Sequence, residues 1–243
     1  MKVVYHEDYN QVYASDPAAA TGRIRAIETE LQGKVLFVTP LAATREDILR
    51  VHSAGHINSV EREGVYAIAA LAAGGAIQAA QIGLTEPCFA VIRPPGHHAS
   101  ASSAWGFCYF NNMAIALEKL KSQGKIDKVF ILDFDLHFGD GNVNILSGKG
   151  YITILNPESL NRKDYLKSVE DALGQTDADL IAVSAGFDNH EADWGGLLKT
   201  EDYTFMGRLV SETARRNKGG YNHQVLGKNV LAFIEGLGGK EEI

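Results

Sequence analysis

Three clusters of ionisable side chains in this sequence have the residue types that bind metals or move protons. They are His97 and His98 in RPPGHHAS; Asp133, Asp135, His137 and Asp140 in DFDLHFGDG; and Asp188, His190, Glu191 and Asp193 in GFDNHEADWGG. A single aspartate in a loop is usually a solvated residue or a helix cap. Four ionisable groups within eight residues, directly after an apolar run, instead indicate a site. We interpret the three clusters as parts of that site.

The middle cluster suits a metal ion. Asp133, Asp135 and His137 alternate along the chain, so an extended backbone would turn their side chains to one face, where two of them could bind one ion. Adding Asp188 from the third cluster gives two carboxylate oxygens and one imidazole nitrogen. Catalytic zinc requires three protein ligands and an open position for water, because the metal lowers the pKa of that water and polarises a carbonyl.

The paired histidines, His97 and His98, suit general acid and base catalysis. Adjacent histidines alone are weak evidence, since one can pack or cap while the other is exposed. Together with a carboxylate-rich loop they indicate acid and base catalysis, because imidazole titrates near neutral pH and can both accept and donate a proton.

Apolar runs rich in Val, Ile and Phe predict buried strands, and the three clusters follow three of them. The runs are KVVY at 2–5, KVLFV at 34–38, CFAVI at 88–92, KVFILDF at 128–134, YITIL at 151–155 and LIAVSA at 180–185. Helical patterns lie at 45–62, 65–84, 113–123, 164–173 and 200–216. The alternation predicts an α/β fold with a mainly parallel sheet covered on both faces. Sites in such folds form beyond the carboxyl ends of strands, where the clusters stand.

Size and charge narrow the classes of function. The chain has 243 residues, of which 45% are hydrophobic, and a formal net charge of -7. This size predicts one globular domain spanning residues 1–243. An acidic chain is not expected to bind nucleic acid, whose phosphates call for Lys and Arg, but it would favour cationic partners. The two cysteines, Cys88 and Cys108, have no paired metal spacing.

We predict a cytoplasmic location without a membrane association. No run of about 18 apolar residues would span a bilayer, and the N-terminus has no apolar signal region. The alanine-rich segment AIAALAAGGAIQAAQ is interpreted as a buried helix, because small residues let a helix pack closely on a sheet. The sequence is compatible with an oligomer.

Five motifs in order resemble the histone deacetylase superfamily, from about Ser15 to Leu231. They are RPPGHHA, GFCYFNN, DxDxHxGDG, SAGFD followed by HEADWGG, and GGYN. The resemblance implies a three-layer α/β fold related to arginase, with a mainly parallel sheet of about eight strands flanked by helices. It also implies one catalytic divalent metal, usually zinc, and the removal of an acyl group from an amine.

The resemblance assigns roles to the matching positions. Asp135, His137 and Asp188 would bind the metal, and His97 and His98 would lie beside the metal-bound water. Asp133 would orient His97, and Asp140 would orient His98, by hydrogen bonds that fix the tautomer. Tyr221 would donate its hydroxyl to the substrate carbonyl, while Gly106 and Phe107 would line a narrow channel for the aliphatic arm of the substrate. His98 would remove a proton from the water, and a histidine would protonate the departing amine.

Three positions depart from the family pattern. Phe138 follows His137 where the family commonly has a second histidine, but this residue is not a ligand. Leu155 stands where a serine often contributes to a structural potassium site, which leaves backbone carbonyls to supply ligands for a potassium ion. The early signature reads DPAAATGR, which weakens any expectation about contacts at the entrance.

Two other functions remain open from the sequence. An arginase-like ureohydrolase shares the architecture but needs two manganese ions, whereas the clusters offer ligands for one. A degenerate deacylase could bind acylated lysine or polyamine without turnover, although the residues expected for catalysis are present. The natural substrate is also open, because a histone tail, another acetylated protein, an acetylpolyamine and a small metabolite all present the same amide.

The stretch before Tyr221 departs from expectation in its length. The polar segment ETARRNK continues directly into GGYN with no apolar run between them. A helix ending on the far side of the sheet would have to cross the domain in two or three residues, yet an extended residue spans at most about 3.6 Å. We therefore expect either a segment missing between about residues 215 and 219, or a protein that lacks the strand and has Tyr221 displaced.

Overall fold

The computed structural model describes residues 1–217 and 227–238. The strands are β1 Lys2–Val4, β2 Leu36–Val38, β3 Cys88–Ala90, β4 Val129–Asp133, β5 Ile152–Leu155 and β6 Leu180–Ser184. The α-helices are α1 Arg23–Leu31, α2 Arg45–Leu49, α3 Ala54–Arg62, α4 Tyr66–Gly83, α5 Asn112–Ser122, α6 Asp140–Leu146, α7 Arg162–Gln175, α8 Thr200–Asn217 and α9 Gly227–Gly238, and two 3-10 helices span Glu7–Asn10 and Pro17–Ala19. Each predicted strand is present, with its ends shortened.

All strand pairs in the described residues are parallel. The strands form two three-stranded sheets, in the orders β2-β1-β3 and β5-β4-β6. The α/β class with a parallel sheet is therefore confirmed. A single sheet of about eight strands is not confirmed: that number came from the resemblance, whereas the apolar runs in the sequence number six, as do the strands described.

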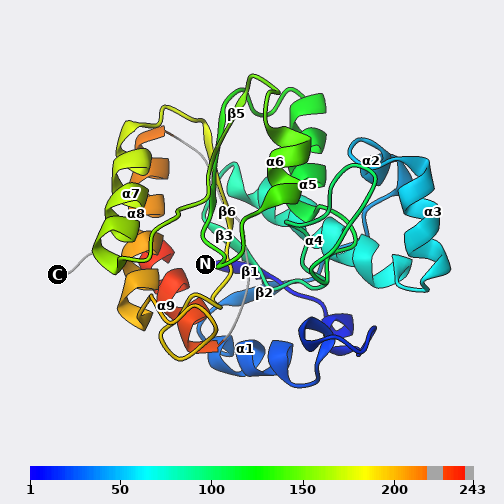
Figure 1. Ribbon diagram of the computed structural model, residues 1–243, viewed down its shortest axis with the longest axis horizontal. Helices are drawn as coiled ribbons and strands as arrows, with labels where there is room; N and C mark the ends of the chain where they lie inside the picture. The colour runs from blue at the N-terminus through cyan, green and yellow to red at the C-terminus, as the bar shows by residue number, and fades with distance from the viewer. Residues whose placement is uncertain (218–226, 239–243) are drawn as a thin grey trace.

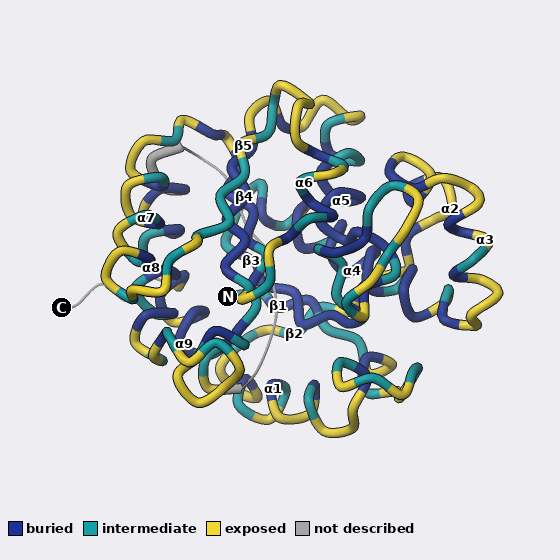
Figure 2. Tube along the Cα trace, in the orientation of Figure 1, coloured by how far each residue is buried: buried dark blue, intermediate teal, exposed yellow. Residues whose placement is uncertain are grey.

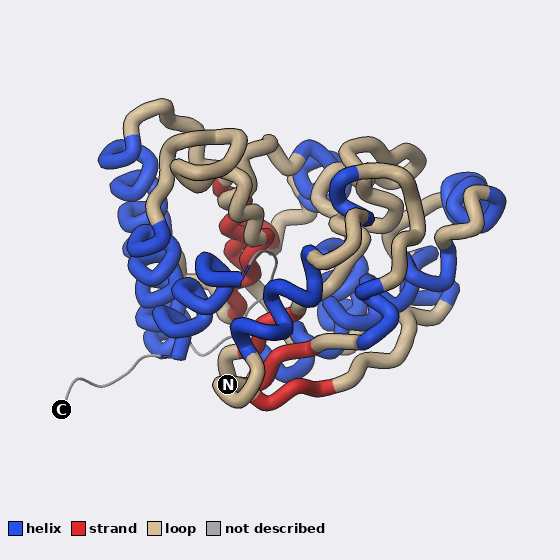
Figure 3. Tube along the Cα trace, turned by 90° about the horizontal axis from the view of Figure 1, so that it is seen from below, coloured by secondary structure: helices blue, strands red, loops and turns tan. Residues whose placement is uncertain are grey.

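Helices enclose the strands in layers. In Figure 1, α7, α8 and α9 lie on one side of the strands, and α4, α5 and α6 lie on the other; Figure 3 shows the strands between these groups from a second direction. Figure 2 shows the strands as largely buried and the outer turns of the helices as exposed. Because both faces are covered, β3 and β4 consist of buried residues throughout, as in parallel sheets generally.

The alanine-rich helix α4 packs closely inside the protein. A Cβ added at Gly74 would lie 1.9 Å from the carbonyl oxygen of Leu41, so only glycine allows this approach. By length and composition α4 could span a membrane, but 72% of that window is buried within the protein. These contacts are those of a core helix.

The helices differ from prediction in two respects. The pattern at residues 45–62 is two helices, because the chain turns after α2 and Ser53 caps α3 by accepting a hydrogen bond from the His56 N–H. Helices α1, α6 and α9 are not among the predicted ones. The last of these crosses α8 closely, and a Cβ added at Gly236 would lie 2.2 Å from the carbonyl oxygen of Thr204.

Candidate active site

The three predicted clusters meet at the carboxyl ends of β3, β4 and β6. The loop after β3 carries the paired histidines, the loop between β4 and α6 carries the second cluster, and the loop after β6 carries Asp188. All three loops line one cavity of about 530 Å³. Parallel strands deliver their loops to one edge of a sheet, so the topology accounts for this meeting.

Asp135, His137 and Asp188 form a triad whose ligand atoms all lie within 4.8 Å of one another. His137 Nδ1 is 3.1 Å from Asp135 Oδ1 and 2.9 Å from Asp188 Oδ2. The expected extended backbone through these residues is wrong, because β4 ends at Asp133 and the chain then bends. The Asp135 carboxylate accepts a hydrogen bond from the His137 backbone N–H at 2.8 Å, which stabilises the bend.

Gly186 gives the Asp135 carboxylate its space in the triad. A Cβ at this position would lie 1.9 Å from Asp135 Oδ2 and 2.6 Å from Asp135 Cα. Any larger residue would therefore push Asp135 away from the other two side chains. The sequence motif SAGFD contains this glycine, but its spacing alone did not reveal that function.

The inner histidine pairs with a fully buried carboxylate. His97 Nδ1 is 3.2 Å from Asp133 Oδ2, and the Asp133 side chain is 0% exposed. Asn142 Nδ2 donates to the same oxygen at 2.9 Å. The second ring nitrogen, His97 Nε2, lies 3.9 Å from Asp135 Oδ2, so the ring connects the buried carboxylate to the triad.

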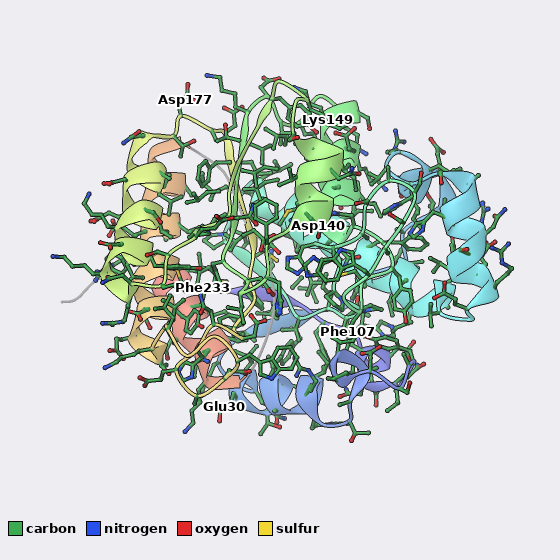
Figure 4. The ribbon with its side chains drawn as sticks, in the orientation of Figure 1. Glu30, Phe107, Asp140, Lys149, Asp177 and Phe233 are labelled. Carbon is green, nitrogen blue, oxygen red and sulfur yellow. The ribbon has the colours of Figure 1, made fainter. Side chains whose placement is uncertain are left out.

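The outer histidine pairs with a carboxylate at the start of a helix. His98 Nδ1 is 2.7 Å from Asp140 Oδ1, and Asp140 is the first residue of α6, where the helix dipole favours a negative charge. Trp105 Nε1 donates to Asp140 Oδ2 at 2.8 Å. Figure 4 labels Asp140, at the start of α6, and Phe107, from the connection between β3 and α5. The Asp140 side chain is 42% exposed, unlike that of Asp133.

Comparison with known proteins identifies the family. The histone deacetylase domain model matches residues 18–157, which is more than half of the chain and includes both histidines and the Asp135–His137 segment. The chain belongs to the histone deacetylase family. A probable deacetylase of Archaeoglobus fulgidus is 32% identical over 252 residues, which cover 79% of this chain and 70% of that protein.

Two further relatives extend the match along the chain. A probable deacetylase of Methanothermobacter thermautotrophicus is 29% identical over 303 residues, covering 99% of this chain and 92% of that protein. The crystal structure of the HDA15 HD domain superposes with a TM-score of 0.82 at 21% identity, over 99% of this chain and 91% of that one, and shows the shared fold.

The two histidines of this deacetylase-family site have opposite pKa shifts. Burial opposes protonation of His97, but the negative charges of Asp133 and Asp135 outweigh it and raise the pKa of His97 to about 9. Burial lowers the pKa of His98, and the positive charge of His97 lowers it further. His98 is therefore neutral near pH 7, whereas His97 carries a proton. Environments that separate two pKa values in this way are typical of acid and base pairs.

The carboxylates of the triad suit a cation. Burial, together with the nearby charge of Asp135, raises the pKa of Asp188 to about 6. A divalent cation between the two carboxylates would relieve this repulsion, and hard oxygen with imidazole nitrogen is a donor set that zinc accepts. The residues present therefore fit zinc. Within residues 1–217 and 227–238, this is the one group of three or more potential ligands.

The cavity has walls from distant parts of the chain. Gly106 and Phe107 both have left-handed backbone angles, with φ of 58° and 64°, and both line the cavity. Trp194 lines it from the loop after β6. Arg93 donates to the carbonyl oxygens of residues 9, 11, 18 and 20, which fixes the N-terminal segment that supplies Pro17 to the cavity. Sequence reasoning missed Trp105, Trp194, Arg93, Asn142 and Gly186, although each lies in or within two residues of a recognised motif.

Not all predicted residues reach the described site. His190 of the third cluster turns to Thr200, with Nε2 at 3.2 Å from its hydroxyl oxygen. Tyr221 and the connection that precedes it lie outside the described residues. For the predicted potassium ion, Leu155 offers no side-chain oxygen, but Asp133 Oδ1 is buried with no hydrogen-bond partner in the structure, so a ligand for such an ion remains.

Proposed function

We propose that this protein is a zinc-dependent amidohydrolase that removes an acyl group, expected to be acetyl, from an amine such as acetyl-lysine or an acetylpolyamine. One observation carries the proposal. A triad of two carboxylates and an imidazole lies in the same cavity as two histidines, each of which is hydrogen-bonded through Nδ1 to its own carboxylate. Membership of the deacetylase family supports the reaction class.

Asp135, His137 and Asp188 would hold the zinc ion. When bound, zinc would polarise the amide carbonyl and lower the pKa of a water molecule. Asp135 is fixed by the His137 backbone N–H, and Asp188 accepts a hydrogen bond from the Leu136 N–H at 3.1 Å. These bonds hold the two carboxylates in place before an ion arrives, which reduces the cost of ordering the site.

His98 is the general base in this proposal. Its Nδ1 is engaged by Asp140, so Nε2 is the nitrogen free to take a proton from the attacking water. Its lowered pKa keeps that nitrogen unprotonated near neutral pH. His97 is protonated and hydrogen-bonded to Asp133, and it would stabilise negative charge on the reacting carbonyl or donate a proton to the departing amine. A bound cation would lower the pKa of His97, because it repels the imidazolium.

Tyr221 would donate a hydrogen bond to the substrate carbonyl. This assignment rests on the GGYN motif alone. The substrate is expected to be cationic, since the chain has a net charge of -7, and Gly106 and Phe107 would contact its aliphatic arm. We assign the whole of residues 1–243 to one catalytic domain, without direct nucleic-acid or membrane binding and with a cytoplasmic location.

A deacetylation assay tests the proposal. The purified chain should release the fluorophore from a fluorogenic acetyl-lysine substrate, and Asp188→Ala should abolish release by removing a zinc ligand. Binding of the acetylated substrate without turnover would instead support the acyl-amine binding module. Two manganese ions per chain, with urea released from a guanidino substrate, would support the arginase-like alternative.

A further inference from the structure

A turn with positive φ angles places the Trp105 ring against His98, the outer histidine. The two residues after it, Gly106 and Phe107, both have positive φ, and this turn brings the indole onto His98. The two ring centroids are 3.9 Å apart, with an angle of 30° between the planes. A Cβ at Gly106 would lie 2.4 Å from His98 Cδ2, so the backbone of the turn also contacts the imidazole.

The same tryptophan holds the partner of that histidine. Asp140 Oδ1 is bonded to His98 Nδ1, and Asp140 Oδ2 accepts a hydrogen bond from Trp105 Nε1–H at 2.8 Å. An indole N–H can only donate, so the direction of this bond is fixed. Each oxygen of the carboxylate therefore has its own partner, and Trp105 contacts both members of the pair.

The carboxylates of the His97–Asp133 and His98–Asp140 pairs are held in place in different ways. The Asp133 carboxylate is held by complete burial and by Asn142, which donates to it at 2.9 Å. The Asp140 carboxylate is 42% exposed, and an exposed carboxylate can rotate in water. Trp105 takes for Asp140 the role that burial and Asn142 take for Asp133.

We propose that Trp105 is a positioning residue for the His98–Asp140 pair. Its N–H fixes the rotation of the carboxylate, and its ring fixes the plane of the imidazole, so that His98 Nε2 keeps one direction into the cavity. The catalytic consequence rests on the proposed function. Without the N–H, His98 would be misaligned in the transition state, so kcat should fall. The groups that bind the substrate would be unaffected, so KM should stay the same.

Kinetics of Trp105→Phe test this role, because phenylalanine keeps a ring against His98 but cannot donate. We expect kcat to fall roughly tenfold, a part of the 10²–10⁴ that proton transfer contributes, with KM changed by less than about twofold. Zinc content and the thermal midpoint should not change. In an Asp140→Ala background the same substitution should have no further effect, since the acceptor of the Trp105 N–H and the partner of His98 are both gone. A full kcat in Trp105→Phe, or an equal fall in both backgrounds, would overturn the proposal.

Fluorescence tests the contact without turnover. The chain has two tryptophans, so Trp194→Phe leaves Trp105 as the single reporter. In that background His98→Ala should change the emission of Trp105, whereas His190→Ala, which removes a histidine turned to Thr200, should not. Unchanged emission on loss of His98 would overturn the role of Trp105. If His98→Ala changes the emission of Trp105 as expected but the wild-type chain does not deacetylate the substrate, only the proposed function would be overturned.

Discussion

At the residue scale, two histidines of the same type acquire different chemistry from their neighbours. His97 lies between two carboxylates, Asp133 and Asp135, whose charges outweigh burial and raise its pKa. His98 has one carboxylate partner, Asp140, and a positively charged neighbour, so burial dominates and its pKa falls. The family resemblance implied the pairing of these residues, but no spacing rule predicts which imidazole stays neutral, because that depends on distances between loops.

Removal of His98 tests its assignment as the base. His98→Ala should lower kcat by about 100-fold or more, since a general base commonly contributes 10²–10⁴, while zinc content stays the same. His190→Ala is the matched control, because this histidine comes from the same edge of the sheet but is bonded to Thr200. Steady-state kinetics with metal analysis give the answer. A His98→Ala protein with wild-type kcat would show that the base is wrongly assigned.

Gly186 allows a test of the triad that alters no ligand. Gly186→Ala would bring a methyl group 1.9 Å from Asp135 Oδ2, so Asp135 must move, and zinc affinity should fall at least about tenfold, equivalent to about 1.4 kcal/mol. Gly174→Ala, at a position with nothing within 4 Å, should leave zinc binding unchanged. Competition with a chromophoric chelator measures both. Equal affinity in the two variants would contradict the described geometry.

At the element scale, apolar runs in the sequence predicted every described strand, and helical patterns predicted six of the nine described α-helices. It failed where a side chain acts locally. The pattern at residues 45–62 continues through residues 50–53, and only the cap formed by Ser53 breaks it. Helix α6 was missed because its first turn has the sequence DGN, which shows no apolar period: Asn142 is buried as the donor to Asp133, and Asp140 bonds to His98.

His52 should make stability depend on pH where α3 meets α5. Its Nε2 accepts a hydrogen bond from the Asn111 N–H at 2.8 Å, which requires an unprotonated nitrogen. Burial, together with the charge of His56, lowers the pKa of His52 to about 4. In the unfolded chain the pKa is about 6.5. The neutral form therefore stabilises the fold above about pH 6.5, and that contribution is lost as the pH falls toward 4.

Denaturant unfolding at several pH values measures this effect. As the pH falls from 6.5 to 4, the free energy of unfolding of the wild type should decrease by about 3 kcal/mol more than that of His52→Asn. Asparagine keeps a hydrogen-bond acceptor at this position but does not titrate. Comparison of the two proteins removes the contribution of carboxylates that both share. Parallel curves for the two proteins would mean that His52 does not titrate with the fold.

The crossing of α8 and α9 depends on contact between their backbones. In Gly236→Ala the new Cβ would lie 2.2 Å from the Thr204 carbonyl oxygen and 2.9 Å from the Arg208 nitrogen, both of which are backbone atoms. Overpacking of this kind costs about 1–3 kcal/mol, which exceeds the gain of about 1 kcal/mol from helix propensity. Gly238→Ala in the same helix, with nothing within 4 Å, is the control. Thermal unfolding should show a lower midpoint for Gly236→Ala only.

At the scale of the whole molecule, the fold class followed from the alternation of apolar runs and helical patterns, and the location of the site followed from parallel topology. The strand count did not, because it was taken from the family rather than from runs present in this chain.

One zinc ion, held by Asp135, His137 and Asp188, is proposed to make this family member a deacylase. A zinc titration of the chelator-treated full chain, with deacetylation of an acetyl-lysine substrate followed at each step, tests this proposal. We predict no turnover without metal and a rise that reaches its plateau at one zinc per chain, absent from Asp188→Ala. Turnover that persists in the chelated chain, or a plateau at two metal ions, would contradict the claim.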